Sequence, residues 1–461
     1  MNQAADAGPS LRLAQFVTQH PDALVPDSAL RAAARVLLDA TGVIRAASGI
    51  AAEVQPFIAL AAEGGAGPAA ILGTSLRARA PLAALANGAM AHALDYEDAF
   101  DAAPVHPNAS LVPAVLALAQ AHRPIGGRAL LAAIAVGCDV SCRIALCLRQ
   151  RLEDGGWYPP PILAAFGAVA GAARILGLSP RQLVDAWSML LLQNSCAGEI
   201  KHDRGTILRA VREAFPAQAA VQVVQLARAG VRGFDAPLEG RDGFFRLFAA
   251  GRYDADVLLG DCGGRWHIEA LSFKSWPSCR GTHAAIECAL NLRKDAEWRD
   301  IRHIRIEGCE VHRMLAEPLA GKRVPQTAID AKFSLPFTVA AALVAGRVDL
   351  DTFTDPVLRH LDVLAVSQLA SFHRRTDWGA DMAVSGAVEV TLLDGRVLRH
   401  EVLQPRGSPA HPLSDAELIA KFVDCAGRAR QPLAAEPANA LARRILQLHT
   451  AVDAGEILAI P

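Results

Sequence analysis

The chain has 461 residues, of which 52% are hydrophobic and 20% are charged. Its 46 basic and 47 acidic residues leave a net charge of −1, which excludes a general electrostatic attraction to a nucleic acid or a membrane surface. A bound anion must therefore be held by a local group of cations. At this length two domains are expected, with enough apolar material for a large buried core.

The first residues hold no basic stretch followed by an apolar one, so no signal peptide is expected. We also expect no membrane-spanning segment, because the apolar stretches are Ala-rich and interrupted by charge or glycine. The nine cysteines are scattered through apolar context, which predicts reduced thiols in a cytoplasmic protein. Cys138 and Cys142 have no second Cys or His pair nearby, so no metal site is expected.

Residues 10–250 carry a helical pattern almost throughout. Ala-rich runs recur there, separated by turn signals such as those at residues 63–65 and 123–127. Apolar residues occupy most faces of these predicted helices, which indicates that the helices pack against one another. Ser179 followed by Pro180 predicts a helix start, with the serine as the cap and the proline in the first turn.

The pattern changes near Trp266. Residues 302–308 alternate between polar and apolar, and residues 387–402 predict two strands joined by the turn at Asp394 and Gly395. Helical stretches lie between these strands, and the helical pattern returns near Pro405. We predict a mainly α fold, with a large all-helical domain (residues 1–267 and 405–461) and a smaller α+β domain (268–404) inserted near the C-terminal third.

An acidic cluster follows a predicted helix at residues 87–98, and His106 lies just beyond it. Adjacent carboxylates raise one another's pKa, and a nearby histidine can relay a proton near neutral pH. The alternative is an acidic helix end with a capping histidine. Acids at the C-terminal end of a helix oppose its dipole, so the pattern favours a functional role for Asp95 and His106.

Two further groups of residues lie downstream in the helical region. Residues 155–161 combine glycines, Trp157, Tyr158 and prolines, which by themselves indicate a stiff structural loop. Arg209 and Arg212 are three residues apart and can share one helix face, where two guanidinium groups could clamp a carboxylate. Their spacing fits an ion-paired surface helix equally well.

A cationic segment, residues 272–283, coincides with the change of pattern. Lys274, Arg280 and His283 lie there beside Cys279. A junction between domains is a common place for a ligand cleft, which makes these cations candidates for binding an anion. A nucleophilic pair of Cys279 and His283 is the alternative, but no third residue that would orient it is evident.

The run NGAMAHALDYEDAF…HPNASLVPAVLALAQ resembles the signature of the MmgE/PrpD family, which includes 2-methylcitrate dehydratase, cis-aconitate decarboxylase and iminodisuccinate epimerase. The similarity continues through FGAVAGAARILGLSP, LEGRDGFF, SFKSWPSCRGTH and DAKFSLPFTVAAAL, and so covers nearly the whole chain. The resemblance implies a helical domain built from both chain ends, a smaller α+β lid domain and a homodimer. It also implies an active site between the domains, with no metal and no cofactor.

By the same resemblance, Asp95 and His106 match the family's active-site acid and histidine, and Lys274 matches its lid-side lysine. Three positions depart from the pattern of the cis-aconitate decarboxylases, and these differences weaken the case for that reaction. The chain has Tyr158 in place of a histidine, Arg209 in place of a lysine and Ala99 in place of a threonine.

The reactions of this family form and protonate a carbanion next to a carboxylate, which requires a proton carrier and nearby positive charge. We expect His106 to transfer the proton, Asp95 to orient it, and Tyr158 to protonate a leaving hydroxyl. The predicted site thus has four catalytic residues, Asp95, His106, Tyr158 and Lys274, and four substrate-binding residues, Arg209, Arg212, Arg280 and His283.

The expected activity is that of a cofactor-independent lyase acting on a small polycarboxylic acid, without nucleic-acid or membrane partners. A hydro-lyase similar to 2-methylcitrate dehydratase ranks first, by analogy with the family. The alternatives are a carboxy-lyase like cis-aconitate decarboxylase, an isomerase like iminodisuccinate epimerase, and a non-catalytic polycarboxylate-binding protein.

Overall fold

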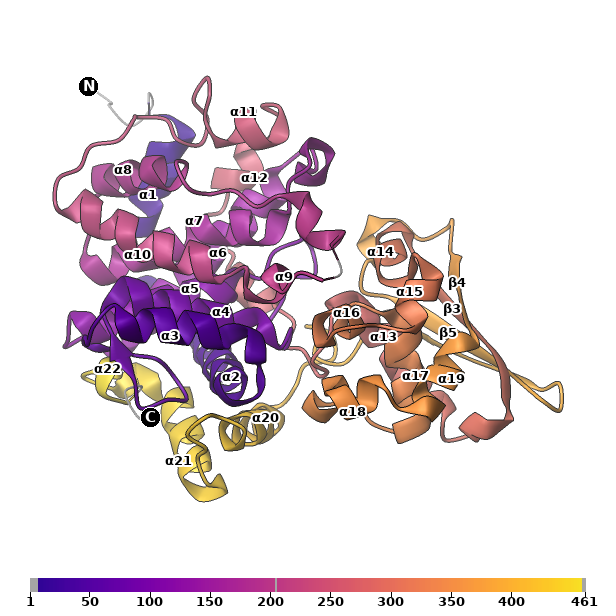
Figure 1. Ribbon diagram of the computed structural model, residues 1–461. Coiled ribbons are helices and arrows are strands. Elements are labelled where there is room, and N and C mark those ends of the chain that lie inside the picture. The colour runs from indigo at the N-terminus through magenta and orange to yellow at the C-terminus, as the bar shows by residue number, and fades with distance from the viewer. Residues whose placement is uncertain (1–6, 204, 458–461) are drawn as a thin grey trace.

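The structure is a computed structural model that describes residues 7–203 and 205–457. Figure 1 shows two parts side by side, a large helical part and a smaller part that contains a sheet. Residues 267–270 still contact helices of the helical part, so the chain enters the smaller part after residue 270, and it returns to the helical part after residue 402. The mainly α class is therefore confirmed. The predicted domain limits and the role of the smaller part as a lid stay predictions.

The helical part begins with twelve helices. They are α1 (Pro9–Gln19), α2 (Asp27–Ile50), α3 (Gln55–Glu63), α4 (Ala80–Ala93), α5 (Pro107–Ala121), α6 (Gly127–Cys147), α7 (Pro159–Leu176), α8 (Pro180–Leu190), α9 (Leu208–Val211), α10 (Ala214–Arg228), α11 (Phe244–Ala249) and α12 (Ala255–Leu259). A two-residue pair of strands, β1 (Ala69–Ala70) and β2 (Arg77–Ala78), precedes α4.

Small residues allow the central helices to pack closely against one another. The helices α4, α5, α6, α7 and α10 contact one another around a core rich in alanine. A Cβ atom on Gly137 of α6 would lie 2.7 Å from the carbonyl oxygen of Gly167 on α7, so only glycine permits this approach. The helix start predicted at Ser179 is confirmed, because its hydroxyl accepts a hydrogen bond from the backbone of Gln182 at the start of α8.

Two central helices, α6 and α7, are long and apolar enough to cross a membrane by length and composition. The bent pair formed by residues 27–50 and 52–63 would add a third such span if it is counted as one. The expectation that no segment is long and apolar enough was therefore wrong. Both α6 and α7 are 94% buried inside the protein, so neighbouring helices cover their apolar surface.

The smaller part holds a four-stranded sheet. Its strands are β3 (Ile301–Gly308), β4 (Ala370–Arg374), β5 (Gly386–Leu392) and β6 (Val397–Val402), in the order β4-β3-β5-β6. The pair β3 and β4 is parallel, and the other two pairs are antiparallel. The predicted hairpin at Asp394 and Gly395 is confirmed, with Thr391 opposite Val397.

Helices cover one side of this sheet in the smaller part (Figure 1). Their bounds are α13 (His283–Leu292), α14 (Arg313–Ala316), α15 (Leu319–Arg323), α16 (Ala328–Lys332), α17 (Leu335–Ala345), α18 (Asp355–Leu358) and α19 (Leu361–Gln368). Among them α13 packs against β5 and β6, and α17 packs against α13 and α19. One face of the sheet is thus buried under helices. The alternation of buried and partly exposed residues along β5 agrees with this arrangement.

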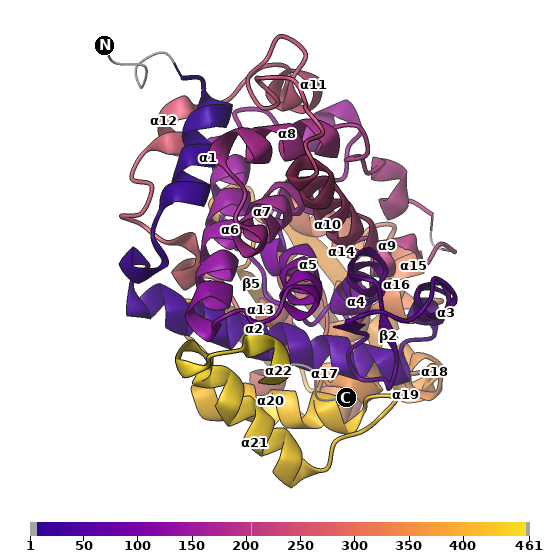
Figure 2. The ribbon, with the colours of Figure 1, turned by 90° about the vertical axis from the view of Figure 1, so that its left-hand side faces the viewer.

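Three C-terminal helices return to the helical part: α20 (Asp415–Gly427), α21 (Ala435–Leu446) and α22 (Ala454–Ile457). In Figure 2 the yellow α20 and α21 lie beside the indigo α2, and both helices contact it. Segments from the two ends of the chain therefore pack together, as the resemblance implied.

Candidate active site

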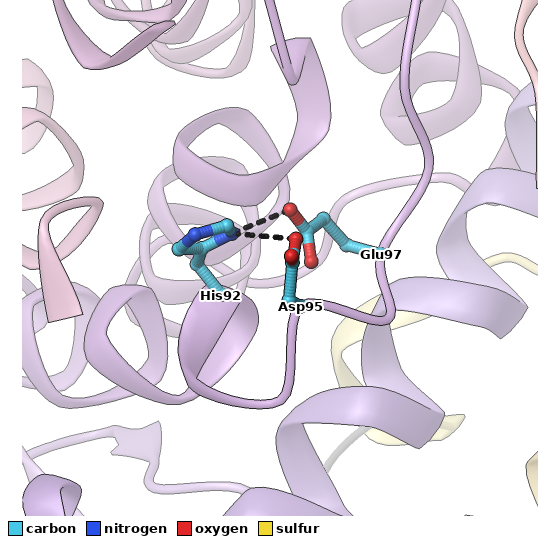
Figure 3. A group of neighbouring side chains, drawn as sticks. All are labelled: His92, Asp95 and Glu97. Atoms are coloured by element: carbon cyan, nitrogen blue, oxygen red, sulfur yellow. Dashed lines mark hydrogen bonds and ion pairs between the residues drawn. The ribbon is translucent and has the colours of Figure 1, made fainter. Parts of the chain in front are cut away.

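The acidic cluster forms a tight turn after α4. The backbone N–H of Asp95 donates to the carbonyl oxygen of His92 at 2.7 Å, and Asp95 itself adopts a left-handed conformation with φ of 50°. Aspartate tolerates this conformation better than most residues, and such strain is often found at functional sites. Asp95, Glu97 and Asp98 are all buried, so the turn concentrates three carboxyl groups in the interior. Figure 3 shows the first two facing His92.

Glu97 is the centre of this cluster. Its Oε1 accepts hydrogen bonds from Nδ1 of His92 at 2.5 Å and from Nδ1 of His106 at 3.1 Å, and lies 3.6 Å from Nζ of Lys274. Burial would raise the pKa of Glu97, but His92, Lys274 and His106 together hold it well below its usual range. The carboxylate is therefore ionised and ties the two histidines together.

His92 has a fixed protonation state. A guanidinium nitrogen of Arg212 donates to its Nε2, while its Nδ1 donates to Glu97. Burial, with the charge of Arg212, lowers the pKa of His92 to about 4, so the ring is neutral at physiological pH. Arg212 also contacts Glu213 at 3.2 Å. Arg212 also donates to the backbone oxygen of Arg209 at 3.2 Å, but its own side chain is outside the lining of the cleft described below, so its predicted role as a substrate ligand does not fit that position.

His106 is the histidine that meets the cleft. Its side chain is 17% exposed, and its Nδ1 lies 3.1 Å from Glu97 and 3.1 Å from the backbone carbonyl oxygen of Asp98. Two acceptors at Nδ1 require the proton to reside there, which leaves Nε2 for a substrate. Asp95 was expected to orient His106. The structure gives that position to Glu97, two residues further along.

Lys274 and Asp95 form a buried ion pair next to Glu97. The backbone of Ala99 bonds to that of Ser272 at 2.9 and 2.8 Å, and this bridge brings the segment of Lys274 beside the acidic turn. Nζ of Lys274 contacts the carboxylate of Asp95 and donates to its backbone oxygen at 3.1 Å. Burial would raise the pKa of Asp95, but Lys274 keeps it below its ordinary value, so both groups are charged.

A cleft of about 1140 Å³ lies between the two parts of the molecule. His106, Arg209 and Arg280 line it, along with Lys201 and residues of the smaller part such as Phe333. Among the predicted site residues, Asp95, Lys274, Tyr158, Arg212 and His283 lie outside this lining. The structure therefore brings three of the eight to this cleft, and one of the other five, Arg212, lines a second cavity of about 480 Å³.

Arg209 is the cleft cation that is poised for an anion. It is only 8% exposed, and its guanidinium stacks 3.4 Å above the ring of Phe333. Within residues 7–203 and 205–457, its Nε and Nη2 have no hydrogen-bond partner. A buried guanidinium with unused donors carries a large desolvation cost, which a bound carboxylate would offset.

Tyr158 packs among cations behind the cleft wall. Its ring lies 5.1 Å from the guanidinium of Arg212, 5.7 Å from that of Arg209 and 5.8 Å from Nζ of Lys201. These distances fit cation–π contacts between the Tyr158 ring and the three cations of residues 201–212. Tyr158 thus supports Arg209, and its expected role as an acid in contact with substrate does not follow from its position.

Arg280 and His283 brace the junction between the two parts. Arg280 binds Asp101 through two nitrogens at 3.0 and 2.9 Å, and donates to Nδ1 of His283 at 3.3 Å. The other ring nitrogen of His283 faces the carbonyl oxygen of Ser278 at 3.3 Å. Both nitrogens of His283 are thus engaged, and burial raises the pKa of the Cys279 thiol, so the alternative of a nucleophilic pair is not supported.

One group in the described residues has the spacing of a metal site. Ligand atoms of His92, Asp95 and Glu97 lie within 4.8 Å of one another (Figure 3). The ammonium of Lys274 already contacts both carboxylates, and Arg212 occupies Nε2 of His92. A divalent cation there would have to displace Lys274, so we assign charge balance in this cluster to the lysine.

Comparison with known proteins decides the family. The MmgE/PrpD N-terminal domain matches residues 11–255, and the MmgE/PrpD C-terminal domain matches residues 276–445. The chain belongs to the MmgE/PrpD family. The resemblance seen in the sequence is thereby confirmed.

Relatives of this MmgE/PrpD protein are about one quarter identical to it. The cis-aconitate decarboxylase-like protein oryM of Aspergillus oryzae is 25% identical, over 97% of this chain and 96% of its own. The cis-aconitate decarboxylase of Aspergillus terreus is 25% identical over 75% of this chain and 74% of its own. The human cis-aconitate decarboxylase is 25% identical over 74% and 71%. The chain is accordingly an enzyme of the lyase class.

Replacing Glu97 by glutamine in this MmgE/PrpD enzyme is expected to lower kcat by about 10- to 100-fold with little change in KM. The amide keeps the shape but loses the charge that fixes both histidines. Steady-state kinetics would check this, with Glu436→Gln on the exposed face of α21 as the control. Unchanged kcat in Glu97→Gln would contradict the role of Glu97.

Asp98 gives a prediction about stability and pH. Burial raises its pKa to about 7, so the folded state keeps a proton that the unfolded chain releases above about pH 4. Folding therefore loses stability as the pH rises from about 4 to about 7. Asn mimics the protonated acid, so Asp98→Asn should raise the free energy of unfolding by as much as about 4 kcal/mol at pH 8 and by little at pH 4. Urea unfolding at both pH values checks this, and an equal difference at both would refute it.

Proposed function

We propose that this enzyme is a lyase that removes carbon dioxide from a small unsaturated polycarboxylate, with His106 as the proton carrier. The observation that carries the proposal is the pairing of two groups in one cleft. His106 presents Nε2 there because Glu97 holds its Nδ1, and Arg209 is a buried guanidinium with unused donors. The first group can move a proton, and the second can hold a substrate carboxylate.

The chemistry follows from these positions. The bond between the substrate and one carboxylate carbon breaks, carbon dioxide leaves, and the electron pair stays on the substrate, delocalised toward a neighbouring carboxylate. Nε2 of the His106 imidazolium then gives its proton to carbon, and His106 recovers a proton from water. Glu97 stabilises the imidazolium, as a carboxylate does beside a catalytic histidine. Arg209 holds the substrate through a carboxylate that does not leave.

Dehydration, which ranked first from the sequence, needs a base for the carbon-bound proton and an acid for the departing hydroxyl. Tyr158 was the expected acid, and it lies behind the wall of the described cleft. Decarboxylation needs only one proton, which His106 can supply. The names of the three relatives support the same reaction, although Tyr158, Arg209 and Ala99 differ from the pattern expected of cis-aconitate decarboxylases.

Proton NMR in deuterium oxide tests the proposal. The purified enzyme would be incubated with cis-aconitate, 2-methylcitrate, citrate and iminodisuccinate in turn. We expect a new unsaturated dicarboxylate with one deuterium at the protonated carbon, together with release of carbon dioxide. A dehydrated product that retains every carboxylate would replace our proposal by the hydro-lyase. Exchange of a proton without any new product would replace it by the isomerase.

Replacing Arg209 by methionine should raise KM for the substrate by about 10- to 100-fold, because the lost carboxylate contact is charge-assisted. Methionine preserves the stacking on Phe333, so the fold should be retained. Steady-state kinetics with Arg149→Met, which alters another arginine of the cleft wall that is already paired with Asp254, provides the control. An unaltered KM in Arg209→Met would remove Arg209 from the substrate site.

A further inference from the structure

Three lysines from distant segments meet the backbone of the acidic turn. Lys332, at the end of α16, donates to the carbonyl oxygen of Ala93 at 3.2 Å. Lys274 donates to that of Asp95 at 3.1 Å. Lys421, on α20, donates to that of Tyr96 at 2.8 Å. All three ammonium groups are buried, although a lysine is seldom buried without a specific partner.

Lys421 makes the largest set of contacts. Besides Tyr96, it donates to the backbone oxygen of Lys274 at 3.0 Å and forms an ion pair with Asp39 of α2 at 2.7 Å. Its Nζ also lies 3.7 Å from the ring centre of Tyr96. One ammonium group thus ties the acidic turn to the segment of Lys274, and anchors both on a helix near the start of the chain.

Lys332 makes the corresponding contact from the smaller part. Ala93 is the last residue of α4, so its carbonyl oxygen is one that the helix leaves unbonded. A cation at that end also favours the helix dipole. The contact crosses from the smaller part to the helical part, next to the residue where the left-handed turn begins.

We propose that Lys332 and Lys421 are positioning residues for the reaction, because with Lys274 they hold the carbonyl oxygens of residues 93, 95 and 96, and so set where the adjoining Glu97 meets His106. This inference rests on the proposed function of His106. Neither lysine lines the cleft, and so each acts through the turn. The resemblance assigned a role to Lys274 alone.

The charged groups around the turn come from every element packed on it. They are Asp39 from α2, His92 from α4, His106 before α5, Arg212 after α9, Lys274 from the junction, Lys332 from α16 and Lys421 from α20. Removing one lysine leaves buried carboxylates short of a countercharge, which destabilises the fold and displaces the turn. The test must separate these two effects.

Three variants provide that separation: Lys421→Met, Lys332→Met, and the double variant Lys421→Met with Asp39→Asn. The double variant removes both members of the buried pair, so it should recover thermal stability that Lys421→Met loses. It still lacks the contact to Tyr96, so its kcat should stay at least about tenfold below that of the unaltered enzyme, with KM changed less than about threefold. Lys294→Met, at an exposed lysine, is the control.

A second readout needs no turnover. The nitrogen chemical shifts of His106, assigned by their loss in His106→Gln, report which ring nitrogen carries the proton. We expect the proton on Nδ1 in the unaltered enzyme and in Lys294→Met, and a mixture of tautomers in Lys332→Met and in the double variant. Unaltered tautomers and unaltered kcat in both would overturn the proposal for the two lysines. An active His106→Gln variant would instead overturn the proposed function, so the two failures are distinguishable.

Discussion

Replacing His106 by glutamine is expected to lower kcat by about 10²- to 10⁴-fold, the usual contribution of a positioned proton carrier. Glutamine can still accept from a donor in the cleft but cannot exchange a proton. Because the His106 side chain is partly exposed at the cleft, the melting temperature should change little. Turnover of the substrate found by NMR, with melting curves, measures both effects.

The matched control for this variant is His202→Gln. His202 also lines the cleft but is exposed, and no contact ties it to Glu97. Its replacement should leave kcat within about twofold, since exposed side chains rarely direct proton transfer. Equal losses in the two variants would indicate that His106 has no special role.

Replacing Lys274 by methionine should cost about 3–5 kcal/mol of folding free energy and nearly all activity. The change leaves Asp95 and Glu97 ionised, buried and without their nearest cation. Urea unfolding measures the first effect and turnover the second. Exposed ion pairs contribute much less, so the size of the loss reports on burial.

The double variant Lys274→Met with Asp95→Asn separates the effect of Lys274 on folding stability from its effect on turnover. It removes both buried charges of the pair, so it should recover most of the lost stability. Its kcat should stay far below that of the unaltered enzyme, because the hydrogen bond from Lys274 to the backbone oxygen of Asp95, which holds the acidic turn in place, is still missing. A Lys274→Met variant that unfolds at the same urea concentration as the unaltered enzyme would contradict the ion pair.

Local patterns were sufficient for some features of the fold. The cap at Ser179 and the hairpin at Asp394 each depend on residues close together in sequence. Charged residues were taken as interruptions of the apolar stretches, and so the length and apolarity of α6 and α7 were underestimated. In the structure such charges are paired inside the protein. Asp139 and Arg143, four residues apart on α6, show this.

The site was harder to predict, because its contacts join distant segments. The sequence indicates an acidic turn and a histidine, but the left-handed backbone at Asp95 determines that Glu97 is the residue that reaches His106. Arg280 was a candidate substrate ligand, and its pairing with Asp101 depends on how the two parts meet. His92 was not among the predicted site residues. Its place in the same segment as Asp95, five residues before Glu97, is a signal that could have identified it.

The role of His106 as proton carrier is tested most directly by a crystal structure of the enzyme with propane-1,2,3-tricarboxylate, a saturated tricarboxylate that cannot complete the reaction. We expect one carboxylate on the guanidinium of Arg209 and a ligand carbon about 3–3.5 Å from Nε2 of His106. We also expect Nδ1 of His106 to stay on Glu97. A ligand bound away from Arg209, or a substrate group on Nδ1 in place of Glu97, would contradict the assignment of His106 as the proton carrier.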